Sequence, residues 1–351
     1  MTKPSMACNS DGHAETGLLP VGRFAPSPSG RMHAGNLFAA LLAWLDVKSR
    51  GGKIILRIED IDTQRCRAEY IDALQRDLEY FGLCWDEGPY FQSKRGEAYE
   101  EALGALEQKG LLYPCYCSRA DLHAASAPHT GEDWVYPGTC RPPESSVRQG
   151  TVLQSPPGTG LKSPSGTGLK AKAFGPVPNV LSLKPARNPS IRIIVPDQII
   201  GFSDALQGEC AQNLKAECGD FILRRSDGGF AYQLAVVIDD AAMGVNSILR
   251  AVDLLDSTPR QIYLQRLLGF SEPQYCHIPL LVDSQGRRLS KRQKDASLDV
   301  LLQRFGNPEQ LIGFLAGLAG LVVQGEALSA AELLPLYNRQ ALLGQTHILW
   351  P

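Results

Sequence analysis

The sequence predicts an α/β protein built on a doubly wound parallel sheet. Short apolar segments, of which residues 53–60 are the clearest, end in carboxylates and are bounded by turn residues. Amphipathic helical patterns alternate with these segments along the chain. Buried strands that alternate with helices are typical of a parallel sheet covered on both faces. With 351 residues, 44% hydrophobic and 21% charged, the chain can bury a substantial core in one large or two medium domains.

The charge balance and the cysteine content limit the class of protein. The chain has 35 basic and 37 acidic residues, a net charge of −2, so any contact with RNA must use a local basic face. Nine cysteines, an odd number, favour a reducing compartment over a disulfide framework. No apolar run reaches the roughly 18 residues that span a bilayer, and residues 1–19 lack the pattern of a secretory signal. We expect a cytoplasmic protein without a membrane partner, and a flexible extension over residues 1–19.

The first predicted unit is a strand, a polar loop and a helix. Residues 21–25 form a short apolar strand, after which prolines, serines and Gly30 interrupt regular structure. Asn36 is the expected N-cap of a helix whose apolar residues are Leu37, Leu41, Leu42 and Leu45. Such a junction directs backbone N–H groups at a phosphate, while Gly35 allows close approach and His33 can donate a hydrogen bond. Taken alone, the stretch could equally be a plain Pro/Gly-rich loop before an amphipathic helix.

The next elements continue the alternation of strand and helix. Residues 53–60 are predicted to form a buried strand. A helix ending at Gly82 is indicated by the spacing of Ile71, Leu74, Leu78 and Phe81. Another helix is expected over residues 96–108, with Gly110 as its C-terminal stop.

The pattern changes at Pro114, where turn residues and cysteines replace helical periodicity. Residues 155–162 and 163–170 match at seven of eight positions, which indicates a tandem duplication. The Pro, Gly and Ser content of this repeat favours a disordered insertion over residues 144–188. A phosphate-binding role for the repeat is the weaker interpretation, because no strand precedes it and no periodic helix follows it.

Regular structure returns after residue 189. Strands are predicted over residues 191–195, 221–225, 247–250 and 277–282, and residues 232–240 form an apolar segment ending in two aspartates. Ser257 is the expected cap of a helix with Pro259 near its start. Residues 283–286 form a turn, and the chain from Leu298 onward is mostly helical and apolar.

A group of cysteines suggests a zinc site. Cys115 and Cys117 are followed by Tyr136 and Cys140, and three thiolates with one further ligand would complete a tetrahedral zinc centre. From spacing alone Tyr136, His123 and His129 compete for the fourth position, and ligand chemistry favours a histidine. The alternative is a set of free cysteines in a reduced protein.

Two further sets of residues could bind a charged substrate. Glu59 lies at a strand end, where the ligand crevice of an open α/β sheet is expected, and its carboxylate could bind an ammonium group. Arg23 and Arg250 could hold carboxylates, and Tyr232 offers a hydroxyl. Lys291, in the basic run 287–292, could neutralise charge on a phosphate. The alternatives are surface ion pairs and a solvated basic loop.

These motifs together resemble the class I aminoacyl-tRNA synthetases. The run His33-Ala34-Gly35-Asn36 resembles their first signature, and residues 287–292, with Ser290 and Lys291, resemble their second. The run of residues 23–28, Arg-Phe-Ala-Pro-Ser-Pro, is similar to the glutamyl branch. Asn36 stands where the general pattern has His, so it is assigned no catalytic role.

The resemblance implies a Rossmann-like catalytic core, an inserted zinc-containing α+β subdomain and a short helical C-terminal region. It implies catalytic roles for Lys291 and His33, and ATP binding by His33, Gly35 and Lys291. The implied glutamate-binding residues are Arg23, Phe24, Ala25, Pro26, Ser27, Glu59, Tyr232 and Arg250. The implied ligands of one structural Zn2+ are Cys115, Cys117, Tyr136 and Cys140, although the gap after Cys117 looks longer than usual and a histidine substitute stays open. Mg2+ is expected to accompany ATP.

The length of the chain suggests which branch of the family it resembles. We expect the catalytic core over residues 20–113 and 219–283, the inserted subdomain over 114–218, and the second signature with the C-terminal helices over 284–351. Only 59 residues follow Arg292, too few for an anticodon-binding domain as well. This is similar to the truncated glutamyl-Q tRNA(Asp) synthetases.

That resemblance implies an ATP-dependent ligase acting in two steps. L-glutamate is activated as glutamyl-adenylate without tRNA and is then transferred to queuosine at the wobble position of tRNA(Asp), with no DNA partner. Two alternatives stay open. One is a truncated glutamyl-tRNA synthetase that charges the 3′ end of a tRNA, and the other is a non-catalytic RNA-binding protein.

Overall fold

A computed structural model describes residues 18–62, 65–118, 135–143, 188–289 and 297–351. Its first sheet is parallel, with strand order β1-β2-β3, and consists of β1 (Val21–Phe24), β2 (Lys53–Ile58) and β3 (Glu87–Phe91). Helix α1 (Ala34–Lys48) connects β1 to β2, and α2 (Ala68–Tyr80) connects β2 to β3. This is the strand–helix alternation that the sequence predicts.

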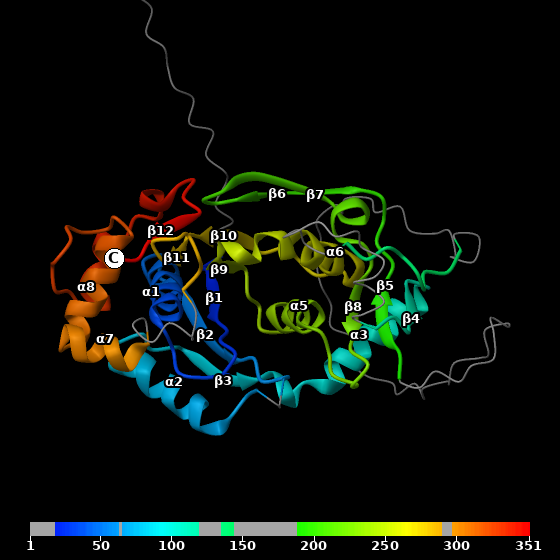
Figure 1. Cartoon of the computed structure of the whole chain (residues 1–351), viewed down its shortest axis with the longest axis horizontal. Coiled ribbons are helices and arrows are strands. Elements are labelled where there is room, and N and C mark those ends of the chain that lie inside the picture. Colours follow the sequence, from blue (N-terminus) through cyan, green and yellow to red (C-terminus); the bar gives the residue numbers. More distant parts are fainter. Residues whose placement is uncertain (1–17, 63–64, 119–134, 144–187, 290–296) are drawn as a thin grey trace, which may run out of the picture.

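A second sheet lies beside the first (Figure 1). Its strand order is β7-β6-β10-β9, with β9 (Ser247–Ala251) and β6 (Ile199–Asp204) parallel to β10 (Gln274–Ile278) and β7 (Gly208–Asn213) antiparallel to β6. The two sheets meet at β1 and β9, where the Asn246 N–H donates to the Val21 carbonyl at 3.0 Å. The carboxyl ends of β1, β2 and β9 therefore come together.

Helices cover both faces of the first sheet, as a doubly wound fold requires. Ile54, Leu56 and Ile58 pack into one core with α1 and the C-terminal helices α7 (Leu298–Phe305) and α8 (Pro308–Leu318). Ile55 packs into a second core with α3 (Gly96–Gln108), α5 (Tyr232–Ala242) and α6 (Thr258–Leu268). Because successive strand residues face opposite ways, Arg57 shares the face of Ile55 and lies on the α5 side.

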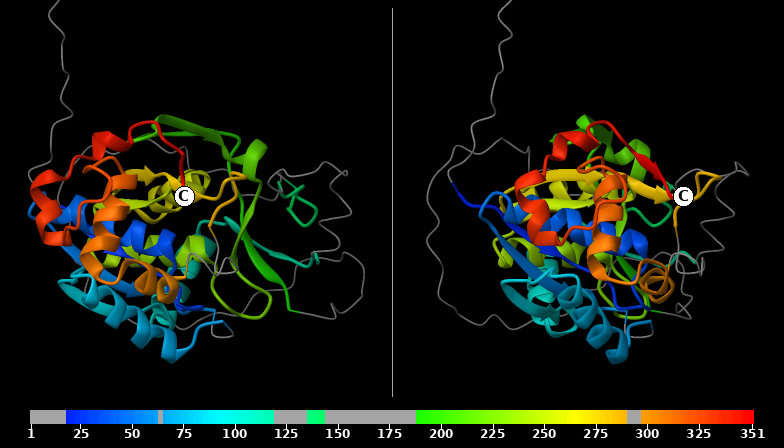
Figure 2. Two further views of the ribbon diagram at one scale, coloured as in Figure 1. Left: turned by 60° about the vertical axis from the view of Figure 1, so that its left-hand side comes forward. Right: turned by 90° about the vertical axis from the view of Figure 1, so that its left-hand side faces the viewer.

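A third, antiparallel sheet carries the cysteine cluster. It has the order β4-β5-β8 and consists of β4 (Leu112–Cys115), β5 (Ser190–Ile193) and β8 (Phe221–Arg224). At the opposite end, β11 (Leu280–Val282) pairs in parallel with β12 (His347–Leu349). Figure 2 shows the C-terminal segments lying beside α1. The remaining short elements are α9 (Ala330–Leu333), η1 (Gln92–Lys94), η3 (Leu214–Cys218), η4 (Val252–Ser257), η6 (Leu334–Leu336) and η7 (Arg339–Leu342).

Most predicted elements are confirmed, and four details differ. The first helix is capped by His33, with Asn36 at its third helical position, so Asn36 as N-cap was wrong. Ser257 precedes α6 but makes no side-chain cap, because it ends η4 with a helical backbone, whereas a capping residue is extended. Its hydroxyl accepts a hydrogen bond from Gln233. The strand predicted over residues 277–282 is divided into β10 and β11.

The fourth difference lies in the C-terminal region. Residues 298–351 are mostly helical as predicted, but they end in β12.

The apolar segment 232–240, which ends in two aspartates, is part of helix α5. No helix within the described ranges is long and apolar enough to cross a membrane. The repeat segment 144–188 lies almost wholly outside the described residues, as does most of the extension 1–19.

Candidate active site

A buried ion pair joins the first sheet to helix α5. Arg57 on β2 has no exposed surface, and its Nη1 donates to Asp240 Oδ1 at 2.6 Å. Its Nη2 donates to Glu59 Oε1 at 3.2 Å. Burial alone would lower the pKa of the Arg57 guanidinium, but the carboxylates of Asp240 and Glu59 outweigh burial and raise it. Arg57 is therefore a fixed cation beneath the strand ends.

Arg23 on β1 reaches the same carboxylate from the neighbouring strand. Its Nε lies 3.3 Å from Asp240 Oδ1, and its Nη1 donates to the Leu249 carbonyl at 3.4 Å. Burial would raise the pKa of Asp240, but Arg57 and Arg23 lower it below its ordinary value. Asp240 is therefore an anion that orients two guanidinium groups.

Glu59 follows the carboxyl end of β2, where the sequence analysis places it. Its N–H donates to the Pro26 carbonyl at 3.0 Å, which joins this strand end to the loop of residues 25–28. Burial raises the pKa of the Glu59 carboxyl, while Arg57 and Arg23 oppose that rise. The cost of burying this carboxylate is thus only partly offset, and an ammonium group would offset it further.

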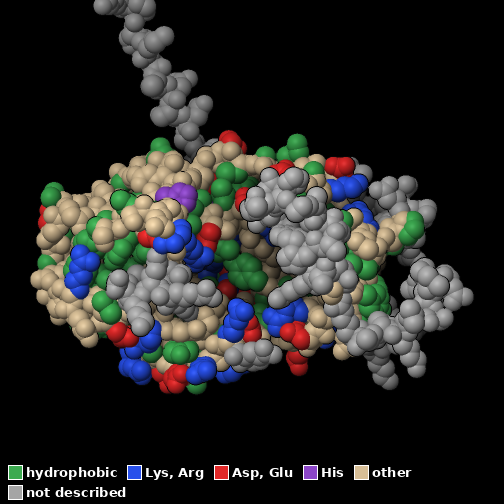
Figure 3. Space-filling model, in the orientation of Figure 1, with side chains coloured by type: hydrophobic (Ala, Val, Ile, Leu, Met, Phe, Trp, Pro, Cys, Tyr) green, Lys and Arg blue, Asp and Glu red, His purple; other side chains and the backbone are tan. Residues whose placement is uncertain are grey.

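Tyr232 and Arg250 complete the group of predicted substrate residues. Tyr232 opens α5, and burial raises the pKa of its hydroxyl; Arg250 opposes this rise, while the Glu59 carboxylate adds to it. The charges of Arg23, Glu59 and Arg250 all act on the Tyr232 hydroxyl, although these residues lie up to 227 positions apart in the sequence. In Figure 3 this face is hollowed over the region between β1 and α5, with hydrophobic side chains inside and Lys or Arg side chains at the edge.

Arg250 is held by polar groups of the protein. Its Nε donates to His277 Nε2 at 2.9 Å, its Nη1 to Gln261 Oε1 at 2.8 Å and its Nη2 to Thr258 Oγ1 at 2.8 Å. A second bond from Nη2 reaches the Leu254 carbonyl at 3.3 Å. These contacts use four of the five N–H groups of the side chain, so the direction of the fifth, on Nη1, is fixed.

The predicted phosphate-binding junction is built around His33. Its Nδ1 accepts the Gly35 N–H at 3.1 Å, and its own N–H donates to Asn36 Oδ1 at 3.4 Å, which completes a capping box. Since Nδ1 accepts, a neutral ring carries its proton on Nε2, from which it can donate to a ligand. A Cβ at position 35 would lie 3.0 Å from His33 Cε1 and would press on the ring, so Gly35 suits this close packing.

The second basic motif is only partly described. Ser290, Lys291 and Arg292 lie outside the described residues, as do His123 and His129. The residues that flank the motif are placed. Ser297 forms a bridge with His33, and the Leu298 N–H donates to the Met32 carbonyl at 3.2 Å. The end of this segment therefore lies against the first motif.

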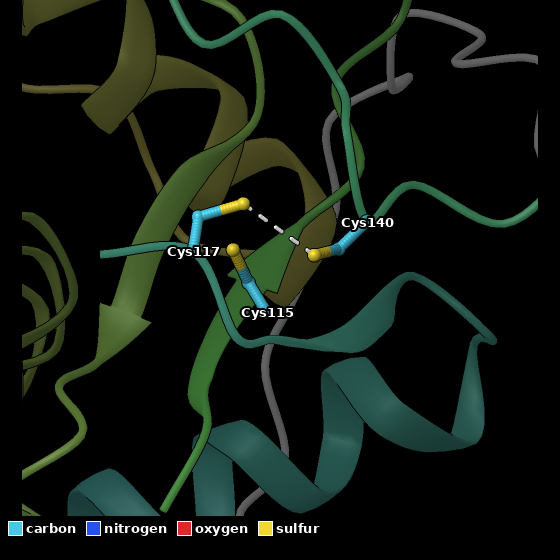
Figure 4. A group of neighbouring side chains, drawn as sticks. All are labelled: Cys115, Cys117 and Cys140. Atoms are coloured by element: carbon cyan, nitrogen blue, oxygen red, sulfur yellow. Dashed lines mark hydrogen bonds between the residues drawn. The ribbon is translucent and has the colours of Figure 1, made fainter. Parts of the chain in front are cut away.

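The three cysteines of the predicted metal site lie together (Figure 4). Their sulfur atoms are all within 4.8 Å of one another, and Cys117 Sγ lies 3.5 Å from Cys140 Sγ. The Tyr136 hydroxyl is 3.4 Å from Cys115 Sγ and 3.9 Å from Cys117 Sγ. Tetrahedral zinc with thiolates at about 2.3 Å requires sulfur separations of about 3.8 Å. The four side chains therefore fit a zinc ion.

Several polar residues of this site were not singled out by the sequence analysis. They are Arg57, Asp204, Asp240 and His277. The signal was present for Arg57, since an arginine inside an otherwise apolar strand must be paired if it is buried. It was also present for Asp240, which ends an apolar helical segment. His277, which binds Arg250, lies 2.6 Å from Asp204 Oδ2 through its Nδ1. Neither residue gave such a signal, because their pairing depends on β6 and β10 being neighbours.

Comparison with known proteins defines the class of this protein. The family of class I tRNA synthetases (E and Q), catalytic domain, matches residues 21–136 and 182–331. The chain therefore belongs to the class I synthetases of the glutamate and glutamine group. A crystal structure of a glutamate tRNA ligase from Elizabethkingia meningosepticum, in complex with its amino acid, has the same fold, with a TM-score of 0.70 and 22% identity, covering 94% of this chain and 67% of that one.

Curated relatives define the family more narrowly. One from Symbiobacterium thermophilum is 43% identical and covers 90% of this chain and 92% of its own length. Another from Nitratidesulfovibrio vulgaris is 41% identical and covers 86% of each chain. Both are named glutamyl-Q tRNA(Asp) synthetase, and this chain is a member of that enzyme family.

Proposed function

We propose that this enzyme activates L-glutamate with ATP and transfers the glutamyl group to queuosine at the wobble position of tRNA(Asp). The observation that carries the proposal is the meeting of two buried arginines, Arg23 and Arg250, with Glu59 and Tyr232 at the strand ends. A substrate with two carboxylates and one ammonium group matches these charges. The shared name of the relatives supports glutamate as the amino acid and queuosine-bearing tRNA(Asp) as the acceptor.

In the first step, a carboxylate oxygen of glutamate attacks the α-phosphorus of ATP, and pyrophosphate leaves. Arg23 and Arg250 hold the two carboxylates, Glu59 holds the ammonium group, and the loop of residues 24–27 borders the substrate. His33 donates from Nε2 to a phosphate oxygen above the N-terminus of α1, with Gly35 leaving room for the nucleotide. Lys291 neutralises charge that grows on the phosphates, and Mg2+ bound with ATP would add positive charge there. This step needs no tRNA.

In the second step, a hydroxyl of the queuosine cyclopentene ring attacks the carbonyl carbon of the adenylate. The new ester bond forms, and AMP leaves. The proton of the hydroxyl passes to the AMP phosphate or to water. The anticodon base must be splayed out of its stack to reach the adenylate.

We further propose that Cys115, Cys117, Tyr136 and Cys140 hold one structural zinc ion. The fit of their spacing supports this, and the sheet β4-β5-β8 anchors them. The Tyr136 hydroxyl accepts the Cys140 N–H at 2.9 Å, which aims it at the cysteines. When bound, the ion supplies a structural crosslink rather than chemistry.

Two assays test the activity. Glutamate-dependent ATP–pyrophosphate exchange without tRNA should be present, and glutamine should not replace glutamate. Radiolabelled glutamate should be transferred to tRNA(Asp) that carries queuosine but not to an unmodified tRNA(Asp) transcript. Charging of tRNA(Glu) instead would favour the truncated glutamyl-tRNA synthetase, and absence of exchange would refute catalysis altogether.

The Lys291→Ala variant tests the second motif. We expect exchange to fall by about 10²-fold or more, since this change removes charge stabilisation from the transition state. Arg287→Ala is the matched control, because Arg287 is exposed and pairs with Asp283 on the surface. Near-normal exchange in Lys291→Ala would refute the proposed role.

A further inference from the structure

We propose that Asp204 and His277 are positioning residues that fix the guanidinium of Arg250 for glutamate. The proposal rests on the proposed function, since it assumes that Arg250 contacts the substrate. The three residues come from three neighbouring strands, β6, β10 and β9. They form one buried chain of hydrogen bonds that leads away from the substrate.

The three side chains of this hydrogen-bond chain are buried. Asp204, His277 and Arg250 are 3%, 0% and 5% exposed. Asp204 Oδ2 lies 2.6 Å from His277 Nδ1, and His277 Nε2 lies 2.9 Å from Arg250 Nε. Because β10 pairs with β9 on one side and with β6 on the other, the imidazole bridges the two strands that carry the charged groups.

The position of the imidazole proton follows from the identity of the donors. Arginine Nε can only donate, so His277 Nε2 must accept. The ring proton therefore sits on Nδ1 and is donated to Asp204. An imidazolium would place a second N–H against that of Arg250. Burial lowers the pKa of His277, and Arg250 acts in the same direction although Asp204 opposes it, so a neutral ring is favoured.

Asp204 is itself held in one orientation. Its Oδ1 accepts the N–H groups of Leu206 at 3.0 Å, Gln207 at 3.0 Å and His277 at 3.2 Å. Oδ2 is thereby directed at the imidazole. An asparagine at this position can keep the three backbone bonds on its oxygen, but its Nδ2 then faces His277 Nδ1 with protons of its own.

The Asp204→Asn variant therefore reverses the direction of these hydrogen bonds while keeping the number of heavy atoms the same. The carboxamide introduced at position 204 would donate to His277 Nδ1, which moves the ring proton to Nε2. Two N–H groups would then face each other across the 2.9 Å between His277 and Arg250. Arg250 must shift to avoid this contact, and its remaining Nη1 N–H would no longer point at the substrate.

We expect Asp204→Asn to raise KM for glutamate by about 10- to 100-fold in the exchange assay, the usual effect of losing a hydrogen bond to a charged group. KM for ATP should change by less than about twofold, because the nucleotide site does not include Arg250. His277→Gln can still accept from Arg250 and donate to Asp204, so it should rescue most of the loss seen in His277→Phe.

Asp220→Asn is the matched control. Asp220 is also buried and also accepts a backbone N–H, that of Val195 at 2.8 Å, but its other partners, Tyr113 and Arg141, lie in and beside the third sheet. This variant should lose stability with no selective effect on KM for glutamate. If Asp204→Asn behaves in the same way, a merely structural role is shown and the proposal is overturned.

A second readout needs no substrate. 15N NMR of the histidine-labelled full chain, with His277 assigned from His277→Gln, should show the Nδ1–H form in the wild type and the Nε2–H form in Asp204→Asn. An Nε2–H or doubly protonated His277 in the wild type overturns the hydrogen-bond chain. If glutamate-dependent exchange is absent, the proposed function fails, while this spectrum still decides the arrangement around Arg250.

Discussion

Asp240 pairs with two buried arginines of the candidate active site. It neutralises Arg57, which is wholly buried, and it orients Arg23 at the end of β1. A buried ion pair of this kind contributes little net stability, but breaking it leaves an uncompensated charge in the interior. Asp240 therefore fixes the positions of the two guanidinium groups, and its removal should lower the stability of the fold.

We expect Asp240→Asn to lower the free energy of unfolding by about 3 kcal/mol at pH 7, because the buried Arg57 guanidinium loses the nearer of its two carboxylate partners. The folded-state pKa of Asp240 is depressed, so its contribution is complete above the unfolded pKa of about 3.9 and is lost as pH falls through the folded value. Urea unfolding of the two proteins should therefore differ at neutral pH and converge only in strong acid.

Glu59→Gln is the informative comparison. The pKa of Glu59 is raised in the folded protein, so neutralising this carboxyl should not destabilise the protein at pH 7. It should nevertheless raise KM for glutamate if Glu59 binds the ammonium group. A destabilisation as large as that of Asp240→Asn would contradict this account of the two carboxylates.

At the scale of elements, helix α1 links the nucleotide loop to the C-terminal region. Its first turn is closed by the His33 capping box, and its buried Asp46 binds the last segments of the chain. Asp46 Oδ1 accepts from Arg339 at 2.9 Å and from Tyr337 at 3.2 Å, while Oδ2 accepts from Arg50 at 2.5 Å. The C-terminal segments are thus anchored on the same helix that presents the phosphate site.

We expect Asp46→Ala to cost about 3 kcal/mol of unfolding free energy, since it leaves Arg50 and Arg339 without a carboxylate. Limited proteolysis should produce a cleavage beyond residue 330 that the unsubstituted protein does not show, because the anchor of that region is lost. Asp299→Ala is the control, because Asp299 is 61% exposed and its pair with Arg31 should contribute less than about 1 kcal/mol. Equal effects of the two variants would argue against the anchor.

The cysteine cluster leads us to expect bound zinc. Purified protein should contain about one zinc per chain, and Cys140→Ser should reduce this content and lower the Tm, because binding of structural zinc is coupled to folding. Tyr136→Phe keeps the three thiolates but should release zinc faster to a chelator, whereas a ligand role for His123 or His129 would leave that rate unchanged.

Cys84→Ser is the control for the zinc measurements. Cys84 is exposed and lies outside the cluster, so its replacement should leave the zinc content unchanged. Undiminished zinc in Cys140→Ser would contradict the proposed site.

For the whole molecule, two cores on opposite faces of the first sheet hold the catalytic strands in place. The Pro, Gly and Ser content of residues 144–188 predicts a disordered insertion. We therefore expect replacement of residues 150–180 by a short Gly-Ser linker to leave exchange within about twofold, and stability equal or slightly higher, since a shorter loop is entropically cheaper to close. Loss of folding or of exchange would show that this segment has a structural or catalytic role.

The sequence predicted most elements because their signals are local. The helices over 68–80 and 96–108 follow from apolar spacing and terminal glycines, and β2 follows from a continuous apolar run. Details that depend on a distant partner were missed. Ser257 is a favoured capping residue type, yet it ends η4 with a helical backbone and its hydroxyl binds Gln233. No pattern near residue 347 indicates that β12 will pair with β11.

The amino-acid sequence by itself determined the α/β class and the cysteine group, because spacing and residue chemistry are readable along the chain. Its resemblance to the class I synthetases implied the residues now proposed to bind glutamate and ATP. The tertiary structure alone decided that Asp240 lies between Arg57 and Arg23, and that His277 joins Asp204 to Arg250. The reason is physical. Burial makes each charge depend on a counter-charge at hydrogen-bond distance, and only the packing of strands that are remote in sequence determines which residue supplies it.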